Sequence, residues 1–227
     1  SSLLALLACL ALPAAAQDPR DTAFLTARDA FRAGDRNKLE RAASQVNGHE
    51  LALYVDNYRL RMWMDQGDSA AMRDFLQRHD KSYVAEKLRG DWLRWLGKRQ
   101  QWSEVEAEYA RLLAPEADQT CWQQQARWQR NDPAVLDEVG KLWLTQLEPP
   151  EACRPVLEAL VASQRLSVDD VWARARRQVE ANRPGQAQIT LNYLPENQVP
   201  DGRSFDQAMS SGMAYLAKLP GQWAGSR

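Results

Sequence analysis

Two cysteines, Cys121 and Cys153, are the residues whose type and spacing most directly suggest covalent chemistry, because they flank a predicted pair of helices. The third cysteine, Cys9, lies in an apolar N-terminal stretch that we expect to be removed. The two cysteines that remain without this stretch are enough for one disulfide bridge in an oxidising compartment. Closing a loop of about 33 residues would stabilise the fold by about 3 to 4 kcal/mol. Two buried free thiols are the alternative.

Other catalytic or metal-binding chemistry finds little support in the sequence. The two histidines, His49 and His79, stand singly near predicted helix ends, and we interpret them as surface residues. A zinc site needs three or four ligands, and no Cys/His spacing supplies them, so we expect no metal and no cofactor. The carboxylates of residues 104–108 and 169–170 are predicted to lie in first helical turns, where they favour the helix dipole. We assign no catalytic residue.

Nine tryptophans in 227 residues are the unusual feature of the composition. Because an indole face can stack on a sugar ring, some of them are candidates for a glycan groove. That groove would include Trp92, Trp95, Trp102, Trp122 and Trp128. The alternative is that tryptophans fill the space between stacked helices, and we favour this packing interpretation.

The charge pattern excludes some classes of partner. An apolar fraction of 44% suits one or two soluble globular domains with a hydrophobic core. A net charge of −1 gives no general attraction for nucleic acid or an anionic membrane, so no nucleic-acid partner is expected. The cluster Arg174, Arg176 and Arg177 is interpreted as a solvated helix face.

Residues 1–16 are typical of a secretory signal, with an apolar stretch followed by small residues and cleavage predicted between Ala16 and Gln17. The stretch is too short for a membrane span, so no stable membrane insertion is expected. Lipid attachment at Cys9 is an alternative, but Leu7 is bulky for such a site. The absence of an initiator Met indicates a signal that is incomplete at its N-terminus.

Helical periodicity accounts for the remaining residues, 17–227. Turns are predicted at about 32- to 34-residue spacing. They fall at Gly34, at Gly67, near Arg99, at Asn131 and near Arg165. One helix pair per period is characteristic of an α-solenoid, so we predict an all-α, superhelical fold of helical-hairpin repeats. Residues of the last predicted helix, at 204–218, look uncovered, and we expect the solenoid to be open at its C-terminal end and the chain to continue beyond Arg227.

Local signals place three helix starts. Asp132 is predicted to cap a helix that has Pro133 at its first position. Ser103 followed by Glu106 matches the pattern of a capping box, and residues 167–170 are predicted to cap a further helix.

Around the cysteines the sequence resembles a known family. The spacing from Cys121 to Trp128, the Lys-Leu-Trp-Leu-Thr run at residues 141–145 and the Glu-Ala-Cys run at residues 151–153 are the features concerned. They are similar to the N-terminal superhelical domain of the soluble lytic murein transglycosylases of the Gram-negative periplasm. The resemblance covers essentially all of the chain after the signal.

This resemblance implies a periplasmic enzyme that cleaves the MurNAc–GlcNAc β-1,4 bond of peptidoglycan to 1,6-anhydro products. In that family the acid–base Glu lies in a C-terminal lysozyme-like domain, near Glu-Ser, Gly-Leu-Met-Gln and Ala-Tyr-Asn motifs. None of these motifs occurs in this chain, so no catalytic residue is carried over and the chain is expected to be inactive alone.

The leading hypothesis is therefore an N-terminal scaffold that acts in murein turnover. Its partners would be peptidoglycan glycan strands and its own C-terminal lysozyme-like domain. The alternative is a free-standing periplasmic helical-repeat adaptor that binds a protein or peptide. A complete enzyme with an unrecognised site is the weakest hypothesis, because no convergent acid–base set is visible.

Overall fold

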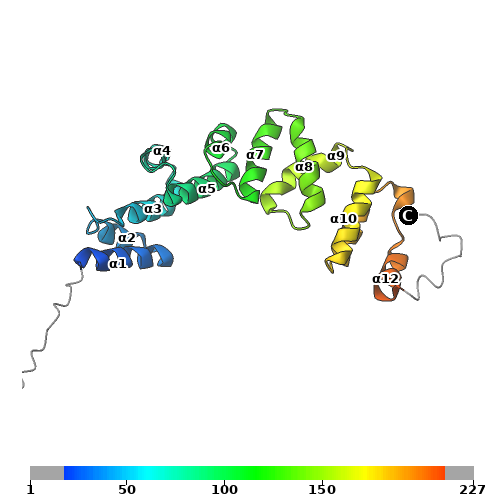
Figure 1. Cartoon of the computed structure of the whole chain (residues 1–227), viewed down its shortest axis with the longest axis horizontal. Helices are drawn as coiled ribbons and strands as arrows, with labels where there is room; N and C mark the ends of the chain where they lie inside the picture. Colours follow the sequence, from blue (N-terminus) through cyan, green and yellow to red (C-terminus); the bar gives the residue numbers. More distant parts are fainter. Residues whose placement is uncertain (1–17, 213–227) are drawn as a thin grey trace, which may run out of the picture. The chain divides into compact units, whose positions relative to one another are not determined.

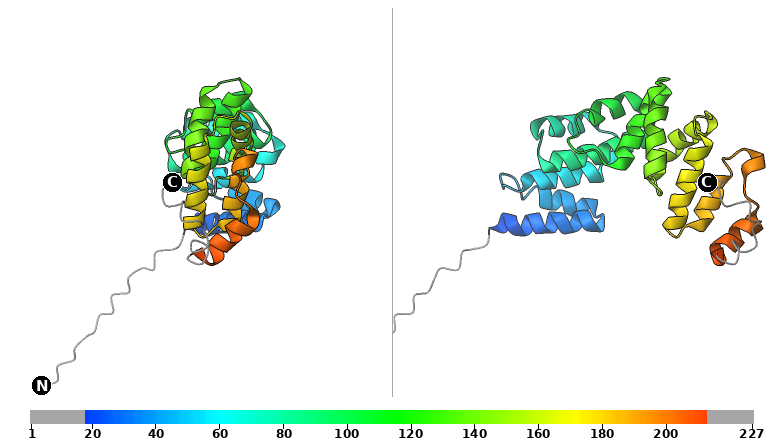
Figure 2. Two further views of the ribbon diagram at one scale, coloured as in Figure 1. Left: turned by 90° about the vertical axis from the view of Figure 1, so that its right-hand side faces the viewer. Right: turned by 45° about the vertical axis from the view of Figure 1, so that its right-hand side comes forward.

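The computed structural model describes residues 18–212, in which there are helices and connecting segments but no strand (Figures 1 and 2). The all-α fold predicted from the sequence is confirmed. Some residues discussed above lie outside the described range, namely Leu7, Cys9, Ala16, Gln17 and residues 213–218 of the last predicted helix.

Short connecting segments join the described helices. Their bounds are α1 (Pro19–Ala33), α2 (Arg36–Ala43), α3 (Ala52–Met62), η1 (Met64–Gln66), α4 (Ser69–Arg78), α5 (Tyr83–Lys98), α6 (Trp102–Tyr109), α7 (Ala117–Gln129), α8 (Ala134–Thr145), η2 (Glu151–Cys153), α9 (Arg154–Ala162), α10 (Val168–Glu180), α11 (Pro184–Leu191), η3 (Glu196–Gln198) and α12 (Gly202–Ser210). The chain divides into two compact units, residues 1–91 and 92–227, and the boundary falls within α5.

The first unit begins with a hairpin of α1 and α2, which lie side by side at the blue end of Figure 1, and α3 packs on both. Small side chains allow this close approach, since Ala23, Ala27 and Ala30 form the buried face of α1. They pack against Leu39 of α2 and Val55 of α3 in one hydrophobic cluster. Burial of this face fixes the hairpin.

The core of the second unit is formed by α8, α9, α10 and α11. Val135, Val139 and Trp143 are the buried face of α8, as the helical spacing predicts. They pack with Val156 of α9 and Val171 of α10 in one cluster. This core holds α8 and α10 in the positions that form the second cavity described below.

Besides Gly48, Lys81 and Asn182, left-handed residues follow α1, η1, α5, α7 and α9, and the spacing of these five matches the period of the sequence. These residues are Gly34 (φ 71), Gly67 (φ 75), Gln100 (φ 57), Asn131 (φ 61) and Gln164 (φ 55). They recur at a spacing of about 32 residues. The left-handed residue lets the backbone turn back after a helix, and glycine adopts it without steric penalty.

Two of the three predicted helix starts agree with the structure. The backbone N–H of Asp170 donates to the Ser167 hydroxyl at 3.1 Å, and the N–H of Ser167 donates to the Asp170 carboxylate at 3.0 Å. Asp132 accepts from the N–H of Ala134 at 3.0 Å, although α8 begins at Ala134, one residue after Pro133.

The capping box predicted at Ser103 is wrong. α6 begins at Trp102, with Gln101 as its N-cap residue, so Ser103 is already inside the helix. Its hydroxyl instead donates to the carboxylate of Glu104 at 2.8 Å. A side chain at this position cannot cap, because its own backbone is helical.

Replacing the left-handed Gln164 by glycine should stabilise the protein. An L-residue in this conformation is strained by about 1 to 2 kcal/mol, and the entropy that glycine loses on folding offsets part of the gain. We expect Gln164→Gly to raise the free energy of unfolding by about 0.5 to 1 kcal/mol, measured by guanidinium titration.

The matched control is Gln188→Gly, which makes the same chemical change at an exposed position inside α11. It should lower the free energy of unfolding by about 1 kcal/mol. A loss of stability in both variants would contradict the conformational explanation.

Candidate functional site

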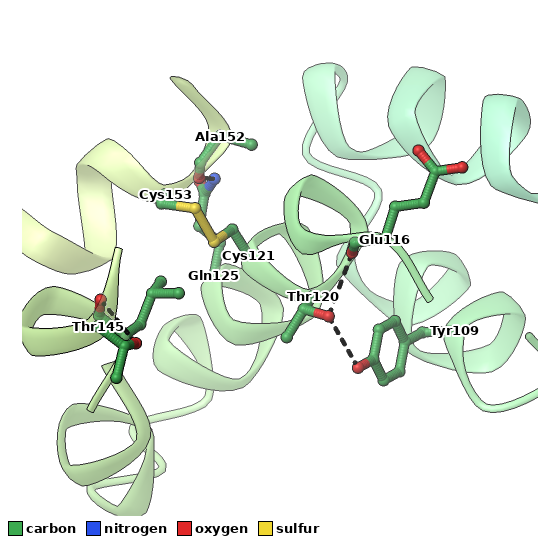
Figure 3. The surroundings of a disulfide bond; sticks show 9 residues. Tyr109, Glu116, Thr120, Cys121, Gln125, Thr145, Ala152 and Cys153 are labelled. Carbon is green, nitrogen blue, oxygen red and sulfur yellow. Dashed lines mark hydrogen bonds between the residues drawn. A yellow bond between two sulfur atoms is a disulfide. The ribbon is translucent and has the colours of Figure 1, made fainter. Parts of the chain in front are cut away.

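A disulfide joins Cys121 of α7 to Cys153 of η2, as the sequence analysis expects (Figure 3). Both side chains are completely buried, and their Cα atoms lie 4.8 Å apart. One turn after Cys121, Gln125 donates from Nε2 to the carbonyl oxygen of Ala152 at 2.7 Å. The bridge and this hydrogen bond together fix η2 against α7.

The start of α7 is held to α6 on the other side of the bridge (Figure 3). The hydroxyls of Tyr109 and Thr120 are hydrogen-bonded at 3.2 Å, and Thr120 also donates to the carbonyl oxygen of Glu116 at 3.3 Å. α7 is therefore positioned from both sides.

A cavity of about 550 Å³, which we call the Trp102 cavity, opens beside the bridge in the second unit. It is lined by Arg94, Gly97, Lys98, Gln100, Trp102, Asp118, Trp122, Gln125, Pro150, Glu151, Ala152, Arg154 and Pro155. Its two indole rings give it apolar walls among polar side chains. Such a mixture is usual in small-molecule sites.

Only two of the five tryptophans considered for a glycan groove line this cavity, Trp102 and Trp122. Trp92 is buried, with 2% of its surface exposed. Trp95 and Trp128 are half-buried and lie outside the lining. The packing interpretation therefore holds for Trp92, whereas Trp102 and Trp122 are available to a ligand.

Gly97 determines where the Trp122 ring can lie. A Cβ atom at Gly97 would come within 2.4 Å of that ring, closer than any real contact. A glycine in α5 thus lets the indole approach the helix backbone. The same close approach forms one wall of the Trp102 cavity.

The charges around the Trp102 cavity are largely paired with one another. Arg94 lies 2.6 Å from the Asp118 carboxylate through Nε and 2.6 Å from the Glu116 carboxylate through Nη2. The hydrogen bond from Arg94 holds the pKa of Asp118 below its usual value. Arg154 pairs with Glu151 at 2.7 Å. These internal ion pairs favour a neutral ligand over a strongly charged one.

A second cavity of about 640 Å³, the Arg174 cavity, lies in the same unit. Its lining comprises Trp143, Leu147, Pro149, Pro150, Glu151, Arg154, Leu157, Glu158, Val161, Ala162, Arg174, Gln178, Gln186, Ile189, Thr190 and Tyr193. Pro150, Glu151 and Arg154 line both cavities. The segment that the disulfide fixes therefore borders both sites.

The interpretation of Arg174 as part of a solvated face is wrong. Only 6% of its surface is exposed, and its guanidinium lies 4.8 Å from the centre of the Trp143 ring. Burial lowers the pKa of Arg174. The buried position arises because Arg174 donates to carbonyl groups at and beyond the end of α8, which have no partner inside the helix.

The two neighbouring arginines are exposed, as predicted. Arg177 donates to the carbonyl oxygens of Leu144 and Thr145, and Arg176 faces solvent. The signal in the sequence that separates Arg174 from Arg177 is helical spacing, because Arg174 shares the face of α10 that carries Val171, Ala175 and Gln178. Of these two residues only Arg174 is buried, and its guanidinium packs against the Trp143 ring.

The histidines are less exposed than expected. The side chain of His49 is 9% exposed, lies 3.0 Å from the Asp21 carboxylate and accepts from the N–H of Leu51 at 3.1 Å. His79 packs against the Phe75 ring, with centroids 4.6 Å apart. Each side chain is partly buried because it covers a helix end.

Among the described residues, no group of three or more His, Cys, Asp and Glu side chains could hold a metal ion. None of the helices between residues 18 and 212 is long and apolar enough to cross a membrane.

The arrangement of helices matches that of the soluble lytic transglycosylases. The 70-kDa soluble lytic transglycosylase in complex with bulgecin A matches with a TM-score of 0.71 and 15% identity, over 86% of this chain and 31% of that chain. SLT70 from Escherichia coli matches with a TM-score of 0.65 and 16% identity, over 88% of this chain and 31% of that chain.

These matches show the fold, and at such low identity they show the fold alone. This chain spans 31% of the length of either structure. No protein-family model matches the chain, and no curated protein matches its sequence.

Loss of the disulfide should destabilise the second unit. The Cys121→Ala/Cys153→Ala double variant should lose about 3 to 4 kcal/mol of unfolding free energy, because the unfolded chain regains the entropy of an open loop. Urea titration with and without reductant measures this loss. The parent protein should respond to reductant and the double variant should not. An unchanged midpoint in the reduced parent protein would contradict a stabilising bridge.

The ion pair of Arg94 and Asp118 predicts a dependence of stability on acid pH. The hydrogen bond from Arg94 holds the pKa of Asp118 in the folded protein below its usual value, so the stability that Asp118 contributes is complete above the unfolded pKa and is lost as pH falls through the folded pKa. Asp118→Asn should therefore lose less stability than the parent protein between pH values of about 4 and 2. Equal acid sensitivity of the two proteins in thermal unfolding would disprove this assignment.

Proposed function

We propose that this chain is the N-terminal scaffold portion of a periplasmic lytic transglycosylase and that it binds peptidoglycan glycan strands. The observation that carries the proposal is the Trp102 cavity, in a fold similar to that of the 70-kDa soluble lytic transglycosylase. In this proposal residues 1–16 are an export signal and residues 17–227 form one helical-repeat domain. A disulfide is consistent with export to an oxidising compartment.

The walls of the Trp102 cavity suit a sugar chain. The rings of Trp102 and Trp122 offer apolar faces to the C–H groups of a pyranose, and the exposed Gln100 places an amide beside them for hydroxyl and N-acetyl groups. The nearby charges are paired within the protein, so an uncharged ligand does not have to break an ion pair to bind.

The scaffold contributes binding, and bond cleavage belongs to a lysozyme-like domain that would dock on it. The scaffold would bind the glycan strand, and the acid–base chemistry would occur in the lysozyme-like domain. The proposal therefore predicts affinity for murein without cleavage by this chain.

Co-sedimentation of the chain with purified murein sacculi tests the proposal. Trp102→Ala should weaken binding by about tenfold, because loss of a buried aromatic face removes about 1 to 2 kcal/mol. Trp172→Ala is the control, since Trp172 packs on the core of the second unit and lines neither cavity. Circular dichroism establishes that both variants are folded.

Neutral β-1,4-linked GlcNAc oligosaccharides identify the part of murein that is bound, because they carry neither the peptides nor the lactyl carboxylate that an amidase would leave on each MurNAc. They should compete with intact sacculi for the parent chain. Unchanged sedimentation of Trp102→Ala, or the absence of competition by these oligosaccharides, would overturn the proposal.

A further inference from the structure

The Arg174 cavity contains a buried charge and a buried acceptor that glycan binding at the Trp102 cavity does not use. We propose that this cavity binds a peptide by its free C-terminal carboxylate, which Arg174 recognises, and by the N–H of the last residue, which donates to Gln178. This proposal does not depend on glycan binding, because it concerns different residues.

Arg174 has donors to spare and no anionic partner. A guanidinium carries five N–H groups. Three hydrogen bonds from Arg174 reach main-chain oxygens, those of Trp143, Gln146 (2.8 Å) and Leu147 (3.3 Å). Its Nε–H has no acceptor among the described residues, and no described carboxylate forms an ion pair with it. The edge formed by Nε and Nη2 matches a carboxylate, which it can bind with two hydrogen bonds.

The carboxylates in the lining are engaged elsewhere. Glu151 and Glu158 lie 2.7 and 4.0 Å from Arg154, and all three side chains are largely exposed at the rim. The positive charge of Arg174 in the interior is therefore not neutralised by the protein. A buried charge of this kind is expensive unless a counter-ion arrives.

Gln178 supplies the second polar contact. It follows Arg174 by one turn of α10, so the two side chains lie on one face of the helix. Only 3% of Gln178 is exposed, and its Oε1 is buried without a donor. A buried acceptor without a donor destabilises the folded protein, and a ligand N–H would remove that cost. The last residue of a peptide presents a carboxylate and an N–H together.

The remaining walls would take an apolar side chain. Ile189 and Tyr193 are 61% and 46% exposed although both line the cavity, and Trp143 lies beside Arg174. A free inorganic anion would use Arg174 alone and leave these apolar surfaces and Gln178 unsatisfied. A volume of about 640 Å³ is within the range of sites for small ligands.

The test is a ¹H–¹⁵N NMR titration of the whole chain with acetyl-Ala-Leu as the free acid, with its C-terminal amide as the matched ligand. The free acid should shift the Nε–H signal of Arg174 and the indole N–H signal of Trp143. The amide should bind at least about tenfold more weakly, since it lacks the charge that Arg174 recognises. Equal binding of acid and amide, or of acetate and the free acid, would overturn the proposal, as would the absence of any shift at these two residues.

Variants at the exposed Ile189 test the charge requirement without removing a buried group. Ile189→Glu should weaken binding of the free acid by at least about fivefold, Ile189→Lys should strengthen it, and Ile189→Gln should lie between them. Equal affinities across this series would also overturn the proposal. Trp102→Ala should leave peptide binding unchanged, so failure of this proposal is distinguishable from failure of glycan binding.

Discussion

The link between Cys121 and Cys153 is the constraint on which both candidate sites depend. It fixes η2 against α7, and Gln125 reinforces it through the carbonyl oxygen of Ala152. Both cavities include Pro150, Glu151 and Arg154, which lie in η2 or directly beside it. Proline has no backbone N–H, so a short segment that contains proline forms few backbone hydrogen bonds. The disulfide, and not a helix or strand, therefore fixes the position of this segment.

The periodicity of the fold could be predicted because local chemistry determines it. A helix that ends in a left-handed residue must reverse, and such residues occur at Gly34, Gly67 and Asn131, where glycine or asparagine is present in the sequence. The turns near Arg99 and Arg165 have no glycine or asparagine, because Gln100 and Gln164 adopt the left-handed conformation there. Only the regular spacing of the turns along the sequence predicts these two.

The sites could be predicted only in part, because burial depends on residues far away in the chain. Trp102 and Trp122 differ from Trp92 through the packing around them, and the position of Trp122 depends on Gly97, which lies 25 positions before it in the sequence. Arg174 is buried because it meets the end of α8, about 30 residues earlier. Helical spacing places Arg174 on the face of α10 that carries Val171, Ala175 and Gln178, away from Arg177, but it does not identify the distant carbonyl groups that make burial of a guanidinium possible.

The central claim is that Trp102 and Trp122 form a surface for glycan strands, and the indole N–H signals in ¹H–¹⁵N NMR spectra test it most directly. A neutral β-1,4-linked GlcNAc oligosaccharide is added to the chain, and the tryptophan signals are followed one by one. The account predicts shifts at Trp102 and Trp122 and none at the buried Trp92. Unchanged signals from Trp102 and Trp122 at saturating oligosaccharide would contradict it.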